Sequence, residues 1–268
     1  MRLKPFEKSL KKWKKVVDNP YKIEYNKRVV RNRKEKHKMK IDRRINYKIV
    51  LDTETCPIDK TVEGVDPTNM FTYDMGWTVT DKRGNIYRRR SFINKDIFIN
   101  EKDLMKSSYY ANKLPKYWED IKAGKRIVAS WYTILKTLRE DMAEFEIKEV
   151  YAYNMRFDYY TTATTQRWLT KSKYRYVFPY GTEICDIMKM AYDVIGKMPT
   201  YRKFCEQNNY FTASGRLSMK AENVYRFIIN NTDFIESHTA LEDAEIETVI
   251  LAYCYKQKKK MRRKLWEN

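Results

Sequence analysis

The sequence predicts an α/β protein whose helices pack on a five-stranded mixed sheet. Three β-prone runs open the ordered part of the chain as a meander, and helical and strand patterns alternate after it. Hydrophobic residues make up 43% and aromatic residues 15% of the 268-residue chain, which is enough for a large core. No apolar run reaches the roughly 18 residues of a membrane-spanning helix, and seven glycines and seven prolines exclude collagen-like and low-complexity classes.

Five runs have the composition and alternation of strands. The turn-forming residues 81–84 join the second run to the third, so these two strands should form an antiparallel hairpin. The first run ends at Asp52 and leads into a loop that contains Pro57 and Pro67. The five runs are residues 47–51, 73–80, 85–93, 149–153 and 183–187.

Helical periodicity marks three further segments. Residues 128–145 predict an amphipathic helix, because apolar side chains recur there every three or four positions. Residues 154–171 predict a second helix that opens on an asparagine, a favourable N-cap residue. The last helix covers 239–257, and its first residue forms a capping-box pattern with Glu242. Residues 94–127 should be helical in pieces.

Positive charge is concentrated at the two ends of the chain. Residues 1–46 hold 18 Lys and Arg against 5 Asp and Glu, and residues 256–268 hold 7 against 1, out of a formal net charge of +20. Such ends suit a polyanion, most simply nucleic acid, with solubilising tails as the alternative. We expect a basic N-terminal arm over 1–46, one domain over 47–256 and a basic C-terminal tail over 257–268.

The arm has a helical pattern near its start, with lysines around an apolar face. Such a helix could lie on a phosphate backbone, on an anionic membrane or against the following domain, and the pattern leaves these alternatives open. The apolar face consists of Leu3, Phe6, Leu10, Trp13 and Val17.

Cysteine usage and the first residues favour a cytoplasmic protein. Lysines interrupt residues 1–20, so this stretch does not have the pattern of a secretory signal. The four cysteines are far apart and form no C-x-x-C pair, so we expect reduced thiols and no zinc site. Usage rich in Lys, Asn, Ile and Tyr is typical of an AT-rich genome, such as that of a phage or another mobile element.

Three acidic stretches are expected at the carboxyl ends of strands, where open α/β sheets bind ligands. The first is Asp52 and Glu54, directly after the first strand, and residues two apart in extended backbone face the same side. The same D-x-E pattern at Asp243 and Glu245 shows that it also arises by chance. Two neighbouring acids directly after a buried strand are, however, unfavourable for stability, which suggests that they serve a function.

The second and third stretches lie at predicted helix starts. Asp158 falls in the first turn of its helix, where the helix dipole favours acids with or without a function. His238 precedes the last helix and Asp243 lies in the first turn of that helix. A lone histidine is usually a surface residue, but one placed five residues before an aspartate at a helix start suggests a shared site.

Together the three stretches supply four carboxylates and one imidazole. Four carboxylates in one place repel one another and shift each other's protonation unless cations lie between them. Mg²⁺ or Mn²⁺ is therefore expected, and two such ions roughly 4 Å apart can stabilise both oxygens of a phosphodiester displacement. The imidazole can take a proton from water near neutral pH.

These residues resemble the motifs of the DEDDh 3′–5′ exonucleases, the family of bacterial proofreading subunits, oligoribonuclease and ribonuclease T. The first motif matches residues 52–54, the second matches 154–158, and the third matches His238 with Asp243. The DEDDy branch would have tyrosine where this chain has Thr239. The resemblance covers residues 47–256.

Two details near the first motif bear on the resemblance. Residues 73–76 resemble the family's second strand, which commonly carries a glycine. Many relatives have Thr-Gly after the first motif, whereas here Thr55 is followed by Cys56 and Pro57. Because proline has no N–H to donate, the terminal nucleotide should be held differently.

The resemblance implies a ribonuclease-H-like three-layer fold and a metal-dependent nuclease. Such an enzyme removes nucleoside 5′-monophosphates from the 3′ end of a single strand, with DNA favoured over RNA here. It further implies that Asp52 contacts both metal ions, that Glu54 and Asp243 complete the first ion site and that Asp158 supports the second. His238 is then the general base.

Binding of the 3′ end requires contacts to bases and backbone. For Met70, Phe71 and Tyr159, ordinary core packing is the more common reason for such a residue. The two motif positions, Asn154 and Phe157, would shape the helix start and the neighbouring pocket. The candidates are Thr55, Met70, Phe71, Asn154, Phe157 and Tyr159.

Two other functions compete with an independent nuclease. A noncatalytic nucleic-acid-binding protein on a nuclease-like fold should have lost a ligand, yet all five motif positions are filled. A proofreading module would act with a polymerase, or another replication or repair protein, in trans. No membrane partner is expected for the domain.

Overall fold

The computed structural model describes residues 41–62, 64–106, 108, 111–171, 173–174 and 176–267. Most of the basic arm expected over 1–46, with its helical pattern, lies outside these residues. From Arg43 onward the chain forms one unit. None of the helices in the described part is both long and apolar enough to cross a membrane.

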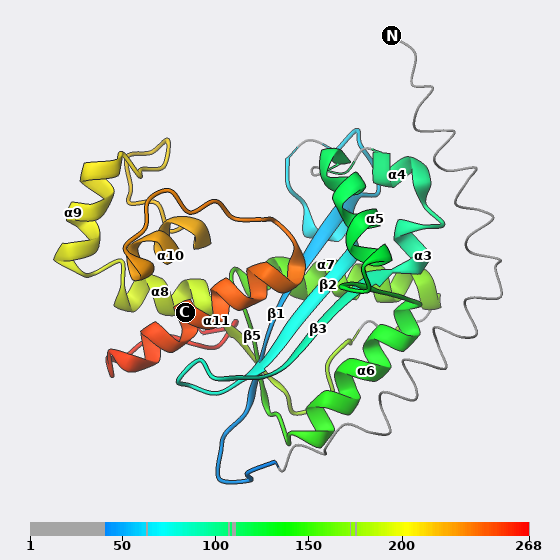
Figure 1. Ribbon diagram of the computed structural model, residues 1–268, viewed down its shortest axis with the longest axis horizontal. Helices are drawn as coiled ribbons and strands as arrows, with labels where there is room; N and C mark the ends of the chain where they lie inside the picture. Colours follow the sequence, from blue (N-terminus) through cyan, green and yellow to red (C-terminus); the bar gives the residue numbers. More distant parts are fainter. Residues whose placement is uncertain are drawn as a thin grey trace. The chain divides into compact units, whose positions relative to one another are not determined.

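A six-stranded mixed sheet forms the centre of this unit (Figure 1). The strand order is β4-β3-β2-β1-β5-β6. The β1–β2 and β2–β3 pairs are antiparallel, whereas the β3–β4, β1–β5 and β5–β6 pairs are parallel. The strands are β1 (Lys48–Pro57), β2 (Met70–Thr80), β3 (Ile86–Asn94), β4 (Ile127–Ala129), β5 (Glu149–Ala152) and β6 (Glu183–Asp186).

Helices cover both faces of the sheet. Neighbouring β2 residues point to opposite faces, and Thr78 bonds to Thr248 of α11 while Trp77 bonds to Asp141 of α6. Trp131 of α6 donates to a glutamine of α7 at 2.8 Å, and α7 lies behind the sheet when α11 lies in front (Figure 1). The helices are α3 (Lys95–Phe98), α4 (Lys102–Lys106), α5 (Leu114–Lys122), α6 (Trp131–Glu144), α7 (Met155–Thr170), α8 (Ile187–Val194), α9 (Pro199–Asn208), α10 (Ala221–Ile229) and α11 (Ala240–Lys256), with 3₁₀ turns η1 (Pro67–Asn69) and η2 (Ala111–Lys113). The α/β class and the three layers are therefore confirmed.

The sheet differs from the prediction in three places. It has a sixth strand, β4, where Val128 was expected to begin a helix; the helix starts instead at Trp131, after the N-cap Ser130. The strand β1 continues through Asp52 and Glu54, because β2 starts early enough to pair with its whole length. For the same reason Met70 and Phe71 belong to β2 and not to the preceding loop.

The helices α8, α9 and α10 form a lobe beside β5 and β6 (Figure 1). Buried side chains of these helices and of α11 make a continuous apolar cluster, which includes Met190, Tyr201 and Val224. No element of this lobe was predicted from the sequence. The lobe contributes to the wall of the cavity described below, because Ala221 at the start of α10 lines that cavity.

The predicted C-terminal tail contacts the domain along its edge strand. Leu265 N donates to Ile184 O at 2.9 Å, and Asp186 N donates to Arg263 O at 2.7 Å. Ion pairs join Arg262 to Asp193 and Lys264 to Glu183. Part of the tail's positive charge is therefore neutralised by the domain's own acids.

Candidate active site

Three carboxylates that are distant in sequence meet on one face of β1. Asp52 and Glu54 lie two residues apart on the strand, so both side chains point to the same face. The first turn of α11, which packs on β1, contributes Asp243. One oxygen atom of each carboxylate lies within 4.8 Å of the other two. This spacing allows the three side chains to share a hard cation.

Gly76 makes the close approach of α11 possible. It pairs with Asp52 in the β1–β2 register. A Cβ atom on Gly76 would lie 2.2 Å from Leu241 N and 2.4 Å from Leu241 Cα. Backbone atoms cannot move aside as a flexible side chain can, so α11 would have to shift away from the sheet. The glycine of the 73–76 motif therefore has a steric function, which is to let Asp243 reach β1.

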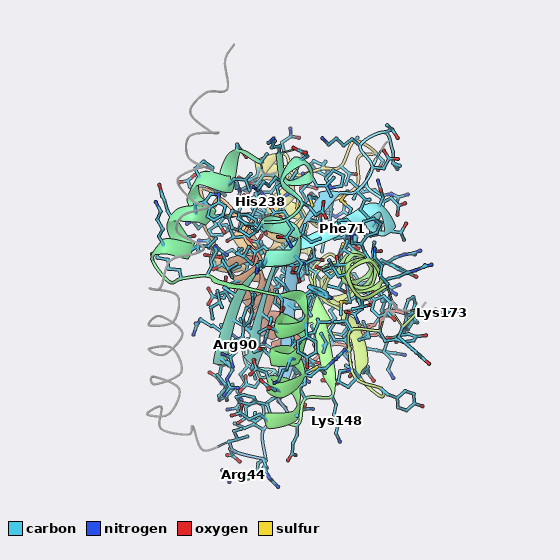
Figure 2. All side chains as sticks on the ribbon, turned by 90° about the vertical axis from the view of Figure 1, so that its right-hand side faces the viewer. Arg44, Phe71, Arg90, Lys148, Lys173 and His238 are labelled. Atoms are coloured by element: carbon cyan, nitrogen blue, oxygen red, sulfur yellow. The ribbon has the colours of Figure 1, made fainter. Side chains whose placement is uncertain are left out.

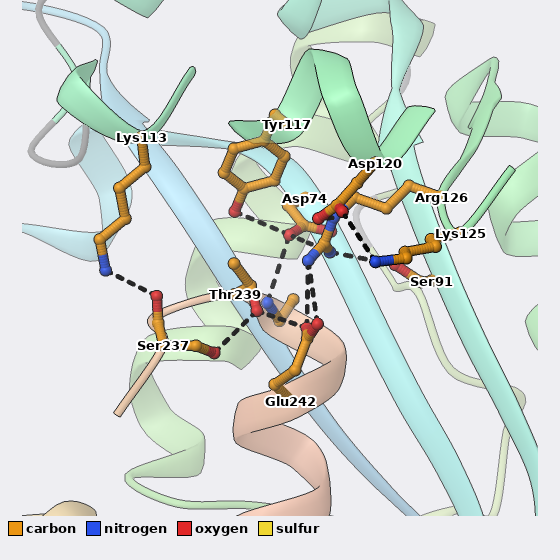
Figure 3. A network of polar contacts seen from close by, with 11 residues as sticks. Asp74, Ser91, Lys113, Tyr117, Asp120, Lys125, Arg126, Ser237, Thr239 and Glu242 are labelled. Atoms are coloured by element: carbon orange, nitrogen blue, oxygen red, sulfur yellow. Dashed lines mark hydrogen bonds and ion pairs between the residues drawn. The ribbon is translucent and has the colours of Figure 1, made fainter. Parts of the chain in front are cut away.

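A buried polar network around Asp74 fixes the start of α11 (Figure 3). The Asp74 carboxylate accepts a hydrogen bond from Ala240 N at 3.2 Å and another from Tyr117 Oη at 2.9 Å. Arg126 pairs with Asp74 at 3.3 Å and with Glu242 of α11 at 3.1 Å. Asp74 thus accepts a helix-start N–H that is usually satisfied by an N-cap side chain.

The capping box expected at this helix does not form. The Thr239 side chain makes no capping bond to the backbone and donates instead to the Glu242 carboxylate. Lys113 Nζ donates to Ser237 O at 2.6 Å, and the hydroxyls of Ser237 and Thr239 lie 2.9 Å apart. The segment that carries His238 is therefore held by contacts on both sides (Figure 3).

Asp158 comes from the first turn of α7. Its Oδ1 accepts a hydrogen bond from Thr53 Oγ1 at 2.7 Å, which joins it to the residue between the two β1 acids. Burial raises the pKa of Asp158 to about 7. Asn154 precedes the helix in the left-handed conformation, with φ 63°, and makes no side-chain cap. Asn154 is therefore the N-cap residue, as the sequence predicted, but without the side-chain bond that usually accompanies this position.

His238 completes the group of five. It has a left-handed φ of 51°, and its side chain lines the same cavity as the carboxylates. Its Nδ1 lies 3.6 Å from Glu236 Oε2. Burial and the positive charge of Lys113 lower the pKa of His238, so the imidazole is neutral at pH 7 and can accept a proton. Figure 2 shows His238 at the end of the domain opposite Arg44 and Lys148.

The two most deeply buried acids outside the site, Asp74 and Asp141, have arginine partners. Asp141 is 1% exposed and forms ion pairs with Arg88 and Arg90. Asp74 is fully buried and pairs with Arg126. Such pairing is the usual condition for burying a carboxylate.

The site carboxylates have no such partners among the described residues. No lysine or arginine in this part of the chain forms an ion pair with any of the four acids, which are Asp52, Glu54, Asp158 and Asp243. Burial and repulsion by neighbouring carboxylates raise the pKa of Asp52 and of Glu54, and burial together with repulsion from Glu236 raises the pKa of Asp243 to about 8. The Oδ1 atom of Asp243 is buried and has no hydrogen-bond partner within the part of the chain that the structure describes. Divalent cations would satisfy this oxygen and offset the repulsion, so the residues fit a metal site.

A fifth carboxylate, Glu247, was not predicted. It follows Asp243 by one helical turn on α11, is 3% exposed and lines the cavity. Its Oε2 accepts a hydrogen bond from Tyr153 N at 3.0 Å. The sequence signal was its spacing of four residues from Asp243, which places both on one helix face.

The acidic groups line an open cavity of about 730 Å³. The loop between β1 and β2 forms one wall, with Val62 and Val65 exposed at 43% and 76%. Among the described lining residues, Lys60 is the one lysine or arginine. A cavity with acids at its base and apolar walls could hold a nucleotide together with cations.

Four of the six predicted substrate contacts line this cavity: Thr55, Met70, Asn154 and Phe157. The other two do not. Phe71 is 1% exposed and packs against Trp168 in the core, so it has no surface for a base. Tyr159 packs edge-on against Trp266 at 5.8 Å, outside the cavity lining.

Comparisons with known proteins give matches among solved structures only. No protein-family model and no curated protein matches the sequence. The nuclease domain of 3′hExo, a DEDDh family member bound to rAMP, matches with TM-score 0.55 and 13% identity over 82% of this chain and 98% of that chain. A 3′-exonuclease in a structure of 3′-end-specific recognition of histone mRNA stem-loop matches with TM-score 0.53 and 14% identity over 98% and 83% of the two chains.

This chain has the fold of a DEDDh nuclease domain. At 13–14% identity the likeness concerns the arrangement of the backbone. The ribonuclease-H-like fold expected from the resemblance is confirmed, with six strands in place of five.

Proposed function

We propose that this chain is a metal-dependent 3′–5′ exonuclease that hydrolyses phosphodiester bonds at the 3′ end of single-stranded nucleic acid. One observation carries the proposal: Asp52, Glu54 and Asp243 converge within 4.8 Å, without a cationic partner among the described residues, in the cavity that His238 also lines. A structural cluster of acids would be paired with arginine, as Asp141 is in this domain.

The proposed cofactors are two Mg²⁺ or Mn²⁺ ions. Asp52 would contact both ions, Glu54 and Asp243 would complete the first site, and Asp158 would support the second. When bound, the ions would stabilise the negative charge that develops on the attacking and leaving oxygens. Asp243 Oδ1, which is buried without a partner, supports a ligand at the first site.

The proposed general base is His238. Its neutral imidazole can take a proton from the attacking water. Glu236 Oε2, 3.6 Å from Nδ1, would favour the tautomer that leaves Nε2 free to accept this proton and would stabilise the imidazolium that results. Both residues line the cavity, so the base is on the same side as the carboxylates.

The cavity would hold the terminal nucleotide. Met70 and Phe157 offer apolar surface beside the acids, and Lys60 offers a positive charge for a phosphate. Pro57 also lines the cavity, so the backbone at this point donates no hydrogen bond to the substrate. We propose DNA as the preferred substrate and nucleoside 5′-monophosphates as products.

A synthetic oligonucleotide assay tests the proposal. Single-stranded DNA labelled at its 5′ end should shorten stepwise in Mg²⁺, and a matched RNA oligomer should shorten more slowly. Asp52→Ala and Asp158→Ala should abolish shortening, whereas the surface variant Asp233→Asn should retain it. Shortening that persists in both alanine variants would place the reaction elsewhere. Binding without shortening would indicate a noncatalytic nucleic-acid-binding protein.

A further inference from the structure

Glu247 is a buried acidic side chain without a neighbouring positive charge to balance it among the residues that the structure describes. It is 3% exposed in the second turn of α11 and lines the acidic cavity. No lysine or arginine of the described chain forms an ion pair with it. Burying a carboxylate without a compensating charge is strongly unfavourable. Its position therefore needs a reason beyond packing.

The hydrogen bond of Glu247 does not supply that reason. Its Oε2 accepts from Tyr153 N at 3.0 Å and so joins α11 to the end of β5. A glutamine carbonyl would accept the same N–H without burying a charge. The hydrogen bond from Tyr153 N therefore does not explain why a charged side chain, and not a neutral one, occupies this position.

The electrostatic neighbours of Glu247 place it beside one half of the acidic site. Asp158 repels Glu247 most strongly, followed by Asp243 and Glu236, and Glu247 in turn repels Asp52. Glu54 is instead repelled by Asp243, Asp74 and Glu236. Asp243 and Glu236 thus repel both glutamates, whereas Asp158 acts mainly on Glu247. Glu247 lines the cavity together with Asp158 and Asp52, so it belongs to the part of the site around Asp158.

Near Asp158, few carboxylate oxygens are free to bind a cation. Thr53 Oγ1 already bonds to Asp158 Oδ1 at 2.7 Å. Glu247 adds a carboxylate whose Oε1 has no hydrogen-bond partner within the described part of the chain. A hard divalent cation takes about six oxygen ligands, several of them water, so a further carboxylate here would strengthen its binding.

We propose that Glu247 is a fifth carboxylate of the cation site and binds the ion shared by Asp52 and Asp158, directly or through a water molecule. This inference rests on the proposed function, because it requires that the cavity holds divalent cations. It adds to the four motif carboxylates a residue that the motif does not contain.

Mn²⁺ binding to the full-length protein tests the proposal without reference to activity. Isothermal titration and electron paramagnetic resonance should give two bound Mn²⁺ per wild-type chain. Glu247→Gln keeps the bond from Tyr153 N and should weaken one of the two ions by about tenfold or more. The matched control Glu245→Gln, on the same helix and paired with Arg89 at the surface, should bind both ions as the wild type does.

Folding is monitored in the same variants. Without divalent ions, Glu247→Gln should be at least as stable to urea as the wild type, because a buried uncompensated charge has been removed. Glu247→Asp is a second variant, which keeps the charge but shortens the side chain, and should also weaken one ion. Wild-type affinity for both ions in Glu247→Gln and Glu247→Asp would overturn the proposal.

The outcomes separate this inference from the proposed function. A wild type that shortens oligonucleotides, with Glu247→Gln binding two ions normally, refutes the inference alone. A wild type that binds two ions with the predicted Glu247→Gln defect, but hydrolyses no nucleic acid, refutes the proposed function alone. A wild type that binds no Mn²⁺ refutes both.

Discussion

The ion-free protein should lose stability as pH rises, which is opposite to the behaviour of a protein whose carboxylates are in ion pairs. The folded pKa of Asp158 is about 7 and that of Asp243 about 8, against an ordinary value of 3.8. Above pH 4 the unfolded chain releases these protons while the folded chain keeps them, so rising pH favours unfolding. The stabilising effect of the protonated groups is complete below pH 4 and is lost by about pH 8.

The size of the effect follows from these shifts. Each group contributes about 1.4 kcal/mol per pH unit while the folded state holds its proton and the unfolded state does not. Between pH 5 and 6.5 the two groups together should lower the free energy of unfolding by about 4 kcal/mol. This is a large part of the roughly 5–15 kcal/mol that stabilises a typical domain.

Urea denaturation of EDTA-treated protein at pH 5, 5.5, 6 and 6.5 measures this slope. Asp243→Asn should reduce it by about 1.4 kcal/mol per pH unit, whereas Asp233→Asn, on the surface, should leave it unchanged. At pH 7.5, Mn²⁺ at a hundred times its Kd should restore about 2.7 kcal/mol to the wild type. Unfolding free energy that stays level or increases from pH 5 to 6.5 would refute the account of the site's electrostatics.

Three other perturbations test separate parts of the account. Gly76→Ala should lower the free energy of unfolding by about 1–3 kcal/mol, from overpacking against Leu241, and should weaken Mn²⁺ binding; stability and affinity equal to wild type in urea and Mn²⁺ titrations would contradict the steric argument. His238→Ala should lower kcat about 10²–10⁴-fold while Mn²⁺ affinity stays near wild type; a parallel loss of affinity would make His238 a ligand. Removal of residues 1–40 should weaken the binding of long oligonucleotides and reduce the salt dependence of that binding, while turnover of very short oligonucleotides is retained. Equal losses on long and short substrates would exclude the arm as an electrostatic contact.

The sequence predicted the class of fold because the strands and long helices have clear periodicity. The helices α7 and α11 begin and end within one residue of their predicted bounds. The short β4 escaped prediction, since three residues cannot show alternation and Val128 also fits the spacing of the next helix. The first strand was ended too early, because the polar residues from Asp52 to Thr55 interrupt its apolar run although pairing with β2 continues.

Within the site, the prediction named the residues but not their surroundings. Asp52, Glu54 and Asp243 converge as the motif spacing suggested. Glu247 was missed because a glutamate in a helix usually faces solvent, and its burial depends on how closely α11 packs on the sheet at Gly76. The contacts of Asp74 also depend on how α11 packs on the sheet. No local sequence pattern shows that this strand residue will accept a hydrogen bond from Ala240 N.

The most direct test of the central claim is anomalous diffraction from crystals grown with Mn²⁺. We expect a strong peak among the carboxylates of Asp52, Glu54 and Asp243, and a second peak on the side of Asp158. Difference density that shows only water among these three carboxylates, at Mn²⁺ concentrations that support oligonucleotide shortening, would contradict this expectation.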